Sequence, residues 1–384
     1  MKLLRFGRRA RPADAEVVVV GSGLPAAAVA LELAHRGRRV VVLGAADERA
    51  ATHGLGLLAC GPACPYSRVV RAVGREGALS LWSAGRENHA RIRAVVQRTR
   101  RDCGYRLRGG FLLSQDRTEA ESLAESEDLL RDDGFPGEFL DHYMLETRFD
   151  VSGFSAAYWA AEEAEVDVAL LFRATAAAAR QAGASFWPGP VHGVEIDRSG
   201  ATAHTPTGSV RAERAVVASD GPVTDVLPEM SQRLRVVAGE CRHFAPARGA
   251  TLPFAARSAD GRFGWQEDAG GITAVSTGTD AVVGADPGLT LDDLLARLHA
   301  VPGGERRWSE RAEWTADGRP LVGLSLDGPL AVVCGLGPWA ASLAFAAARW
   351  IADALASGVD PTPRPLRAAR SLAPRPEDAG ATRG

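Results

Sequence analysis

Residues 16–43 constrain the fold of this chain more than any other segment. Four successive valines at 17–20 form a short apolar run that suits a central parallel strand. Two glycines separated by one residue follow, and residues 24–35 have the composition of a helix. A second apolar run at 40–43 completes a strand-helix-strand unit of the length that nucleotide-binding folds require.

The glycine turn of this unit indicates what it binds. Gly21 permits a tight turn, and Gly23 lets a pyrophosphate approach the N–H groups at the helix N-terminus, where the helix dipole favours anions. Leu24 and Pro25 begin the helix, and Ala26 stands where a third glycine is usual but still permits close packing. The segment therefore predicts a dinucleotide-binding site.

The end of the second strand departs from the usual pattern. An acidic residue normally stands there and binds the adenosine ribose, but this chain has Gly44. Asp47 and Glu48 come later in the loop. Three alternatives follow: the ribose is held differently, the loop bends to bring Asp47 back, or affinity for the adenosine end is reduced.

Composition restricts the other possibilities. A chain of 384 residues exceeds one ordinary core, so two domains are expected. With 46% apolar and 24% charged residues and a net charge of −2, the sequence has no electrostatic signature of nucleic-acid binding. We expect a small-molecule partner.

The cysteines favour a reducing compartment. There are five, an odd number, and no secretory segment precedes them, which predicts free thiols and a cytoplasmic protein. Cys60 and Cys64 are the only close pair, and they lack a second Cys/His pair, so no metal site is expected.

The uncharged stretch 328–348 raises the question of a membrane span. Glycines at 335 and 337 and a proline at 338 interrupt it. Residues 330–334 then read as a buried strand and residues 340–355 as a helix, which favours strand-turn-helix over a membrane segment.

Several later segments, taken in order, resemble one family. They are the glycine-containing loop 51–58, the strand 109–113, the helix and strand within 169–187, the strand 190–196, the strand and turn 214–221, and the segments 315–323 and 332–339. Their order and spacing are similar to the D-amino-acid oxidase/glycine oxidase (DAO) superfamily of FAD-dependent oxidoreductases, over residues 15 to about 360.

This resemblance implies FAD as the cofactor. The cofactor contacts it implies beyond the first turn are His53, Gly54, Gly56 and Leu57 against the flavin ring, Val191 near the adenine, Gly221, and Gly335, Gly337, Pro338, Trp339 and Ala340. The last turn also has a physical use, because N–H groups between a strand and a helix suit the flavin N1/C2 carbonyl edge.

His53 carries a separate hypothesis. Its setting is similar to the segment through which dimethylglycine and sarcosine dehydrogenases attach FAD covalently. A covalent link is not favoured over a loop histidine beside a noncovalent flavin.

The resemblance also implies the reaction, which is oxidation of a C–N bond in a small amine or amino acid by hydride transfer to flavin N5, giving an imine. Two alternatives stay open: a flavin-binding subunit of a multi-subunit dehydrogenase or a non-catalytic FAD protein, and an NAD(P)-dependent dehydrogenase. Oxidase is favoured over dehydrogenase because no electron-transfer motif is present. Some members of the family use a lysine near the flavin to promote reaction with oxygen, but Lys2 is the only lysine here. Either Arg242 or protonated His243 takes that role, or the natural electron acceptor is not oxygen.

Five residues are candidates for the substrate pocket, each with a structural alternative. Arg311 would bind a carboxylate but is also typical of a solvated surface arginine. Two tryptophans, Trp265 and Trp339, suit either an aromatic wall or core packing. Arg242 and His243 lie on an expected strand at 236–244. The candidates are Arg311, Trp265, Trp339, Arg242 and His243.

The expected fold is α/β, with a Rossmann-type FAD-binding domain interleaved with an α+β substrate domain that contains a mainly antiparallel sheet. The FAD domain would comprise residues 15–62, 156–226 and 313–360, and the substrate domain 63–155 and 227–312. Within the latter we expect strands at 262–267 and 271–277 and a helix at 289–300 capped by Thr290. Residues 1–14 and 361–384 are expected to be flexible tails.

Overall fold

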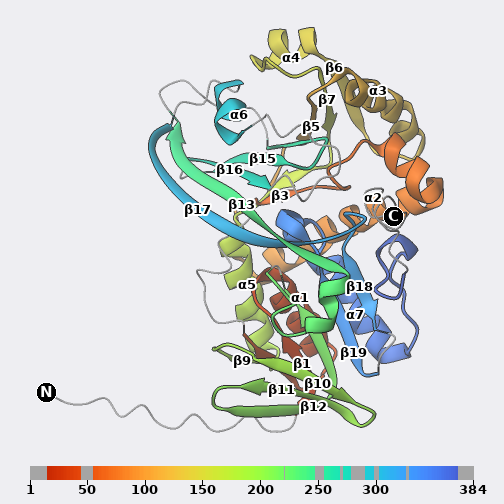
Figure 1. Ribbon diagram of the computed structural model, residues 1–384, viewed down its shortest axis with the longest axis vertical. Coiled ribbons are helices and arrows are strands. Elements are labelled where there is room, and N and C mark those ends of the chain that lie inside the picture. The colour runs from red at the N-terminus through yellow and green to blue at the C-terminus, as the bar shows by residue number, and fades with distance from the viewer. Residues whose placement is uncertain are drawn as a thin grey trace, which may run out of the picture.

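The computed structural model describes most of the chain as one body with two large sheets (Figure 1). The described residues are 15–44, 55–219, 221–246, 255–268, 271–277, 290–297, 302–325 and 328–370. The structure is of mixed α/β class, with a largely parallel sheet and a separate, largely antiparallel one.

The first sheet is built around β1 (Ala15–Val20). This strand pairs in parallel with β2 (Val40–Leu43) on one side and with β12 (Gly208–Ala218) on the other. The valines are fully enclosed because both edges and both faces of the strand are covered. The remaining strands are β9 (Ser185–Trp187), β10 (Gly193–Asp197), β11 (Gly200–Thr205), β18 (Leu321–Leu324) and β19 (Leu330–Cys334).

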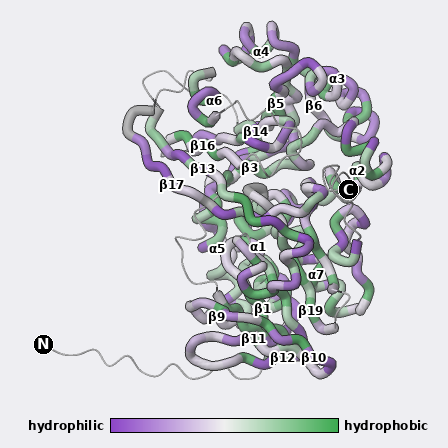
Figure 2. The backbone as a smooth tube through the Cα atoms, in the orientation of Figure 1, coloured by the Kyte–Doolittle hydropathy of each residue, from purple (hydrophilic) through white to green (hydrophobic). Residues whose placement is uncertain are grey.

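Three helices rich in alanine accompany this sheet. They are α1 (Gly23–His35), α5 (Val168–Gln181) and α7 (Ala344–Ser357), and α1 packs against the other two. Small side chains allow these close helix contacts. Figure 2 shows hydrophobic residues gathered where α1 and α7 meet the sheet, and hydrophilic residues along the outer helices α3 (Arg117–Asp132) and α4 (His142–Phe149).

The second sheet has eight strands, and β5 with β14 is a parallel pair among antiparallel ones. Its longest pair, β13 with β17, runs from this sheet toward the first one (Figure 1). In sheet order the strands are β17 (Pro302–Thr315), β13 (Leu234–Pro246), β16 (Gly271–Thr277), β15 (Phe263–Asp268), β14 (Ala256–Ser258), β5 (Gly110–Ser114), β7 (Ala156–Ala160) and β6 (Gly137–Asp141). The short helix α6 (Leu291–Arg297) contacts β16.

A small sheet and a long helix join the two halves. The small sheet consists of β3 (Leu57–Leu58), β8 (Ala164–Glu165) and β4 (Arg106–Leu107). The helix α2 (Tyr66–Thr99) packs against α3, α5 and α7. Three short 3₁₀ segments complete the described elements: η2 (Pro228–Gln232), η4 (Gly337–Ser342) and η5 (Arg364–Leu366).

Several expected boundaries need correction. The second segment of the nucleotide domain was expected to begin at residue 156, but residues 156–160 form β7, which pairs with β5 and β6 in the second sheet. Residues 313–315 were also placed in the nucleotide domain, yet they continue β17. Strand pairing across long sequence distances decides both cases, and local composition does not report it.

The C-terminal boundary also differs from expectation. The flexible tail was expected from residue 361, but Leu366 and Ala368 are each 2% exposed and pack on the body. Arg370 binds Asp317 there through two hydrogen bonds, of 2.9 and 3.1 Å. Residues 1–14 and 371–384 lie outside the described part of the chain.

The helix expected at 289–300 is present as α6, and the cap expected at Thr290 is confirmed as part of a capping box with Asp293. The Asp293 N–H donates to Thr290 Oγ1 at 3.2 Å, and the Thr290 N–H donates to the Asp293 carboxylate at 2.8 Å. The helix expected at 340–355 instead begins at Ala344, because η4 precedes it. Within the described ranges, no helix is long and apolar enough to cross a bilayer.

Candidate functional site

The turn after β1 must be glycine for a steric reason. A Cβ at Gly21 would lie 1.9 Å from the Ala218 carbonyl oxygen, so the turn is pressed against the end of β12. The Gly21 N–H donates to the Leu43 carbonyl at 3.0 Å, which also ties the turn to β2. The predicted role of Gly21 in a tight turn is thereby explained by its two neighbouring strands.

The helix that follows begins without a side-chain cap. Ser22 is the N-cap in extended conformation, makes no capping hydrogen bond, and the first turn of α1 contains no acidic residue. The first N–H groups of a helix have no acceptor within the helix, and the helix dipole adds positive potential there. This N-terminus therefore has the chemistry of an anion site.

An open pocket of about 570 Å³ adjoins this N-terminus. It lies at the carboxyl ends of β1, β2 and β12, which is where open parallel sheets bind ligands. Its walls are Val20, Gly21, Ser22, Gly44, Pro188, Gly189, Pro190, Val191, Val217, Ser219, Pro222, Val223, Asp225 and Val226. The pocket brings Val191 to the glycine turn, and Gly221 is close by, since its N–H donates to Ser219 Oγ at 3.0 Å.

Gly44 lies in the wall of this pocket with φ +91°. A Cβ on Gly44 would be 3.2 Å from the Gly21 carbonyl oxygen, so a side chain here meets both strain and crowding. Asp225 is the carboxylate among the residues that line the pocket. Asp47 and Glu48 lie outside the described residues, so the alternative of a bent loop is untested.

A second turn lies at the same edge of the sheet, after β19. Strand β19 is parallel to β12, which is parallel to β1, so their carboxyl ends share one edge. Gly335 and Gly337 have φ values of +66° and +57°, and η4 starts there without a side-chain cap. A Cβ at Gly337 would lie 2.8 Å from the ring of Trp314. Ala340 is buried in this turn, and the side chains of Pro338 and Trp339 are outside the described part.

Strand β3 lies beside this second turn. Gly56 precedes it and has no room for a side chain, because a Cβ would lie 1.7 Å from the Val166 carbonyl oxygen. Leu57 is fully buried, and Ser342 of η4 hydrogen-bonds the backbone on either side of Leu58. His53 and Gly54 fall outside the described residues, so the hypothesis of a covalent link is untested.

A buried carboxylate that the sequence analysis missed lies beside the loop that follows β12. Glu313 is 2% exposed and accepts hydrogen bonds from the Thr224 N–H and hydroxyl, each at 3.0 Å. Burial raises the pKa of Glu313. Its second oxygen, Oε2, has no partner among the described residues. An unsatisfied buried oxygen of this kind suits a hydroxyl donor from a ligand.

Of the five substrate-pocket candidates, two have structural roles. Trp265 is 2% exposed and packs in the core of the second sheet beside Phe154. Arg242 is also buried, and it ion-pairs with Glu240 at 2.8 Å, with Glu305 at 3.4 Å and with Asp292. Three carboxylates surround this guanidinium, which gives Arg242 a structural role, and its place in the substrate pocket stays a prediction.

Arg311 lies on the surface, whereas His243 lies on the face of β13 that is turned toward β3. Arg311 is 59% exposed and lies 3.8 Å from the Asp225 carboxylate, which makes it the surface arginine that was its alternative interpretation. His243 shares a face of β13 with Cys241, which packs against Leu55 and Leu57 near β3. His243 Nδ1 is 3.1 Å from Thr273 Oγ1. It is therefore the candidate that faces the β3 side of the sheet.

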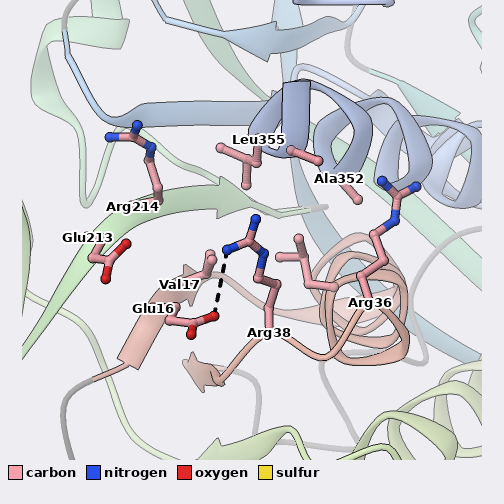
Figure 3. A pocket seen from close by; sticks show the side chains of 10 residues that line it. Glu16, Val17, Arg36, Arg38, Glu213, Arg214, Ala352 and Leu355 are labelled. Atoms are coloured by element: carbon pink, nitrogen blue, oxygen red, sulfur yellow. Dashed lines mark ion pairs between the residues drawn. The ribbon is translucent and has the colours of Figure 1, made fainter. Parts of the chain in front are cut away.

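Another hollow, of about 300 Å³, lies at the opposite, amino end of β1 (Figure 3). Both signs of charge line it: Glu16 and Glu213 together with Arg36, Arg38 and Arg214. Glu16 and Arg38 are 3.9 Å apart. Since the charges oppose one another and the hollow is far from the glycine turn along β1, it is not part of the nucleotide site.

Asn88 on α2 is a further residue that the sequence analysis missed. It is fully buried, and it hydrogen-bonds the backbone of Ala341, Phe345 and Ala346. The signal in the sequence was a polar residue within the apolar stripe of an amphipathic helix, between Leu81 and Ile92.

No group of three or more potential metal ligands occurs in the described ranges.

The residues present fit an FAD. The uncapped N-terminus of α1 suits a diphosphate, and the glycine turn is a cradle that any Cβ at Gly21 would fill. The pocket between Gly44 and Val191 has room for the adenosine end, and the turn at Gly335 presents a second uncapped N-terminus.

Comparison with known proteins agrees with this arrangement. A family model described as FAD dependent oxidoreductase (DAO) matches residues 16–354. No curated protein matches the sequence.

Solved structures match over nearly the whole chain at low identity. Glycine oxidase from Geobacillus kaustophilus has a TM-score of 0.73 and 21% identity, over 94% of this chain and 100% of that one. L-Amino acid deaminase from Proteus vulgaris has a TM-score of 0.69 and 19% identity, over 95% of this chain and 96% of that one. L-Proline dehydrogenase from P. horikoshii has a TM-score of 0.68 and 15% identity, over 92% of this chain and 96% of that one. At these identities the likeness shows the fold alone.

Proposed function

Because the chain belongs to the DAO family of FAD dependent oxidoreductases, we propose that it oxidises a C–N bond in a small amine or amino acid. The observation that carries this proposal is that two uncapped helix N-termini, those of α1 and η4, follow strands whose carboxyl ends share one edge of the sheet. Family membership also favours FAD over the NAD(P) alternative.

The chain's residues have distinct roles in this proposal. The α1 N-terminus would hold the diphosphate, the pocket at Val191 would receive the adenosine, and the N–H groups of η4 would stabilise negative charge on the flavin ring. When bound, FAD supplies the two-electron acceptor for a hydride from the carbon next to nitrogen. The substrate carbon loses that hydride and the nitrogen loses a proton to solvent, so a C=N bond forms. Water then hydrolyses the released imine to a carbonyl compound and ammonia or an amine.

Apolar side chains keep water from the reacting atoms. Leu55 and Leu57 at β3 pack with Cys241, Ala255 and Val275 of the second sheet in one buried cluster. A closed apolar boundary protects a hydride acceptor from solvent and strengthens nearby electrostatic interactions.

We propose oxygen as the electron acceptor. Lys2 is the only lysine in the sequence. Arg242 is enclosed by carboxylates, which leaves His243 as the candidate cation on the β3 side of the sheet. The names of the matching structures, a glycine oxidase, an amino acid deaminase and a proline dehydrogenase, support an amino acid or a related amine as the substrate class.

One series of measurements tests the proposal. The purified protein should show a flavin absorption spectrum that glycine, D- and L-amino acids or N-methylated amines bleach in the absence of air. Fast recovery of the spectrum in air, with formation of hydrogen peroxide, supports an oxidase. Recovery only with an added dye indicates a dehydrogenase or a subunit that needs a partner. A bound flavin that no amine bleaches, or the absence of flavin, overturns the proposal.

Acid denaturation tests the covalent hypothesis at His53 separately. Flavin that stays with the precipitated polypeptide supports the link, and flavin released into the supernatant contradicts it. We expect release.

A further inference from the structure

Asn88 caps a helix that begins more than 250 residues later in the chain. Its Nδ2 donates to the Ala341 carbonyl at 2.8 Å, and the two residues are 253 positions apart in the sequence. Its Oδ1 accepts from the N–H groups of Phe345 at 2.9 Å and Ala346 at 3.3 Å. Helix α7 has no side-chain cap of its own, since its N-cap is Leu343. Asn88 therefore takes the place of a local cap.

The long helix α2 can reach this position because it is closely packed. A Cβ on Gly85, one turn before Asn88, would lie 2.2 Å from the Cys60 carbonyl oxygen. Asn88 is 0% exposed, so all its hydrogen bonds are made in a site without water competition. Removing one partner in such a site leaves the others unsatisfied.

Ser342 makes a second connection from the other side of the turn. Its hydroxyl donates to the Leu57 carbonyl at 3.0 Å and accepts from the Ala59 N–H at 2.9 Å. The last residue of η4 is thereby bound to both flanks of Leu58 in β3. Together the two side chains fix η4 against α2 and against β3.

We propose that Asn88 and Ser342 are positioning residues that set the direction of the free N–H groups of η4 toward the flavin carbonyl edge, and thereby set how readily the ring accepts electrons. The inference rests on the proposed function, because it requires FAD to lie at this turn. Preorganised donors stabilise developing charge without reorganisation during the reaction, and the first N–H groups of a helical segment have no acceptor within it. Asn88 takes up two N–H groups of α7, those of Phe345 and Ala346, and thereby fixes the segment that follows η4. A turn released from either connection loses that preorganisation.

The experiment compares three variants. Ser342→Ala removes the connection to β3, and Asn88→Asp keeps an acceptor for α7 but loses the donor to Ala341 and adds negative charge near the ring edge. Ser126→Ala is the matched control, since its buried hydroxyl also accepts a backbone N–H, from Ser67 at 3.0 Å, and donates to a carbonyl, of Ser122 at 2.6 Å, but in α3.

The readouts need no substrate. Sulfite binds oxidised flavin more tightly when negative charge at the N1/C2 edge is better stabilised, and its dissociation constant is measured by bleaching. The reduction potential is measured against reference dyes, and FAD affinity by titration of the apoprotein. We expect Ser342→Ala and Asn88→Asp each to weaken sulfite binding about tenfold and to lower the potential, and Ser126→Ala to change neither by more than about twofold.

The outcomes separate this inference from the proposed function. Wild-type protein that binds no FAD contradicts the proposed function. Wild-type protein that binds FAD, with Ser342→Ala unchanged in sulfite affinity and potential, overturns the positioning role alone. An equal loss in Ser126→Ala also overturns it, because the effect would then be general destabilisation. Ser342→Thr, which retains the hydroxyl, should recover most of the sulfite affinity.

Discussion

Arg257 and Glu163 form a bidentate ion pair in the interior of the protein. The Arg257 Nη1 donates to Glu163 Oε2 at 2.5 Å and its Nη2 to Oε1 at 2.7 Å, with the side chains 3% and 1% exposed. Arg257 belongs to β14 of the second sheet, and Glu163 precedes β8 of the small sheet. The pair therefore fastens the second sheet to the segment that leads into α5.

Replacing one partner of this ion pair should lower the free energy of unfolding more than replacing both partners. Arg257→Met leaves a buried carboxylate without its partner, and we expect the free energy of unfolding to fall by about 3–5 kcal/mol. Combining Arg257→Met with Glu163→Gln should recover part of that loss. Urea denaturation measures both. Arg71→Met, in the exposed pair with Glu125 at 2.8 Å, is the control and should cost below about 1 kcal/mol. Equal effects in the buried and exposed pairs would contradict this interpretation.

Gly44 should not accept the acidic residue that nucleotide sites usually have at the end of the second strand. With φ +91° and the Gly21 carbonyl oxygen 3.2 Å from where a Cβ would lie, Gly44→Glu combines strain with crowding. We expect a loss of about 1–3 kcal/mol of stability and no gain in FAD affinity. Gly37→Ala is the matched control, because it shares a left-handed φ of +76° but has nothing within 4 Å. Tighter FAD binding by Gly44→Glu would show that position 44 can serve the ribose.

The stability that Asp317 contributes should be lost in acid, when its carboxylate becomes protonated. Burial opposes its ionisation, but hydrogen bonds from Arg370 outweigh it and lower the pKa of Asp317. A lowered folded-state pKa contributes stability above the unfolded-state value of about 4, which is lost as pH falls through the folded-state pKa. We therefore expect Asp317→Asn to cost about 3 kcal/mol at pH 7 and progressively less below about pH 4.

Urea unfolding at several pH values checks this, with Asp128→Asn as the control. Asp128 pairs with Arg131 on the surface and is 77% exposed, so its loss should cost below about 0.5 kcal/mol at every pH. A difference between wild type and Asp317→Asn that stays constant from pH 7 to pH 3 would exclude Asp317 as the titrating group.

The parts of the fold that were predictable have local causes. The expected strand at 330–334 matches β19, and that at 271–277 matches β16, because apolar runs bounded by glycine define both ends. Helix α2 was not predicted, although it has 34 residues. Asn88 and His89 interrupt its apolar stripe, and Gly74 departs from helical geometry within it, so its periodicity is obscured.

The residues of the candidate site also fall into those that the sequence predicts and those that it does not. Gly21, Gly335 and Gly337 were predictable because a tight backbone path needs glycine, and that need is visible in the sequence. The roles of Asn88, Ser342 and Glu313 depend on backbone partners in segments far along the chain. No local pattern encodes such a contact, so only the packed structure assigns these residues.

Gly337 offers a test of the turn itself. A Cβ there would lie 2.8 Å from the Trp314 ring, and φ is +57°, so Gly337→Ala must displace either the ring or η4. We expect FAD affinity of the apoprotein to fall about tenfold or more, which corresponds to about 1.4 kcal/mol. Gly358→Ala isolates the backbone effect, since Gly358 has φ +72° at the end of α7 with nothing within 4 Å. That control should lose about 1 kcal/mol of stability and bind FAD as the wild type does. If both variants bind FAD equally well, the turn after β19 does not contact the cofactor, because displacing it would then have no effect on binding.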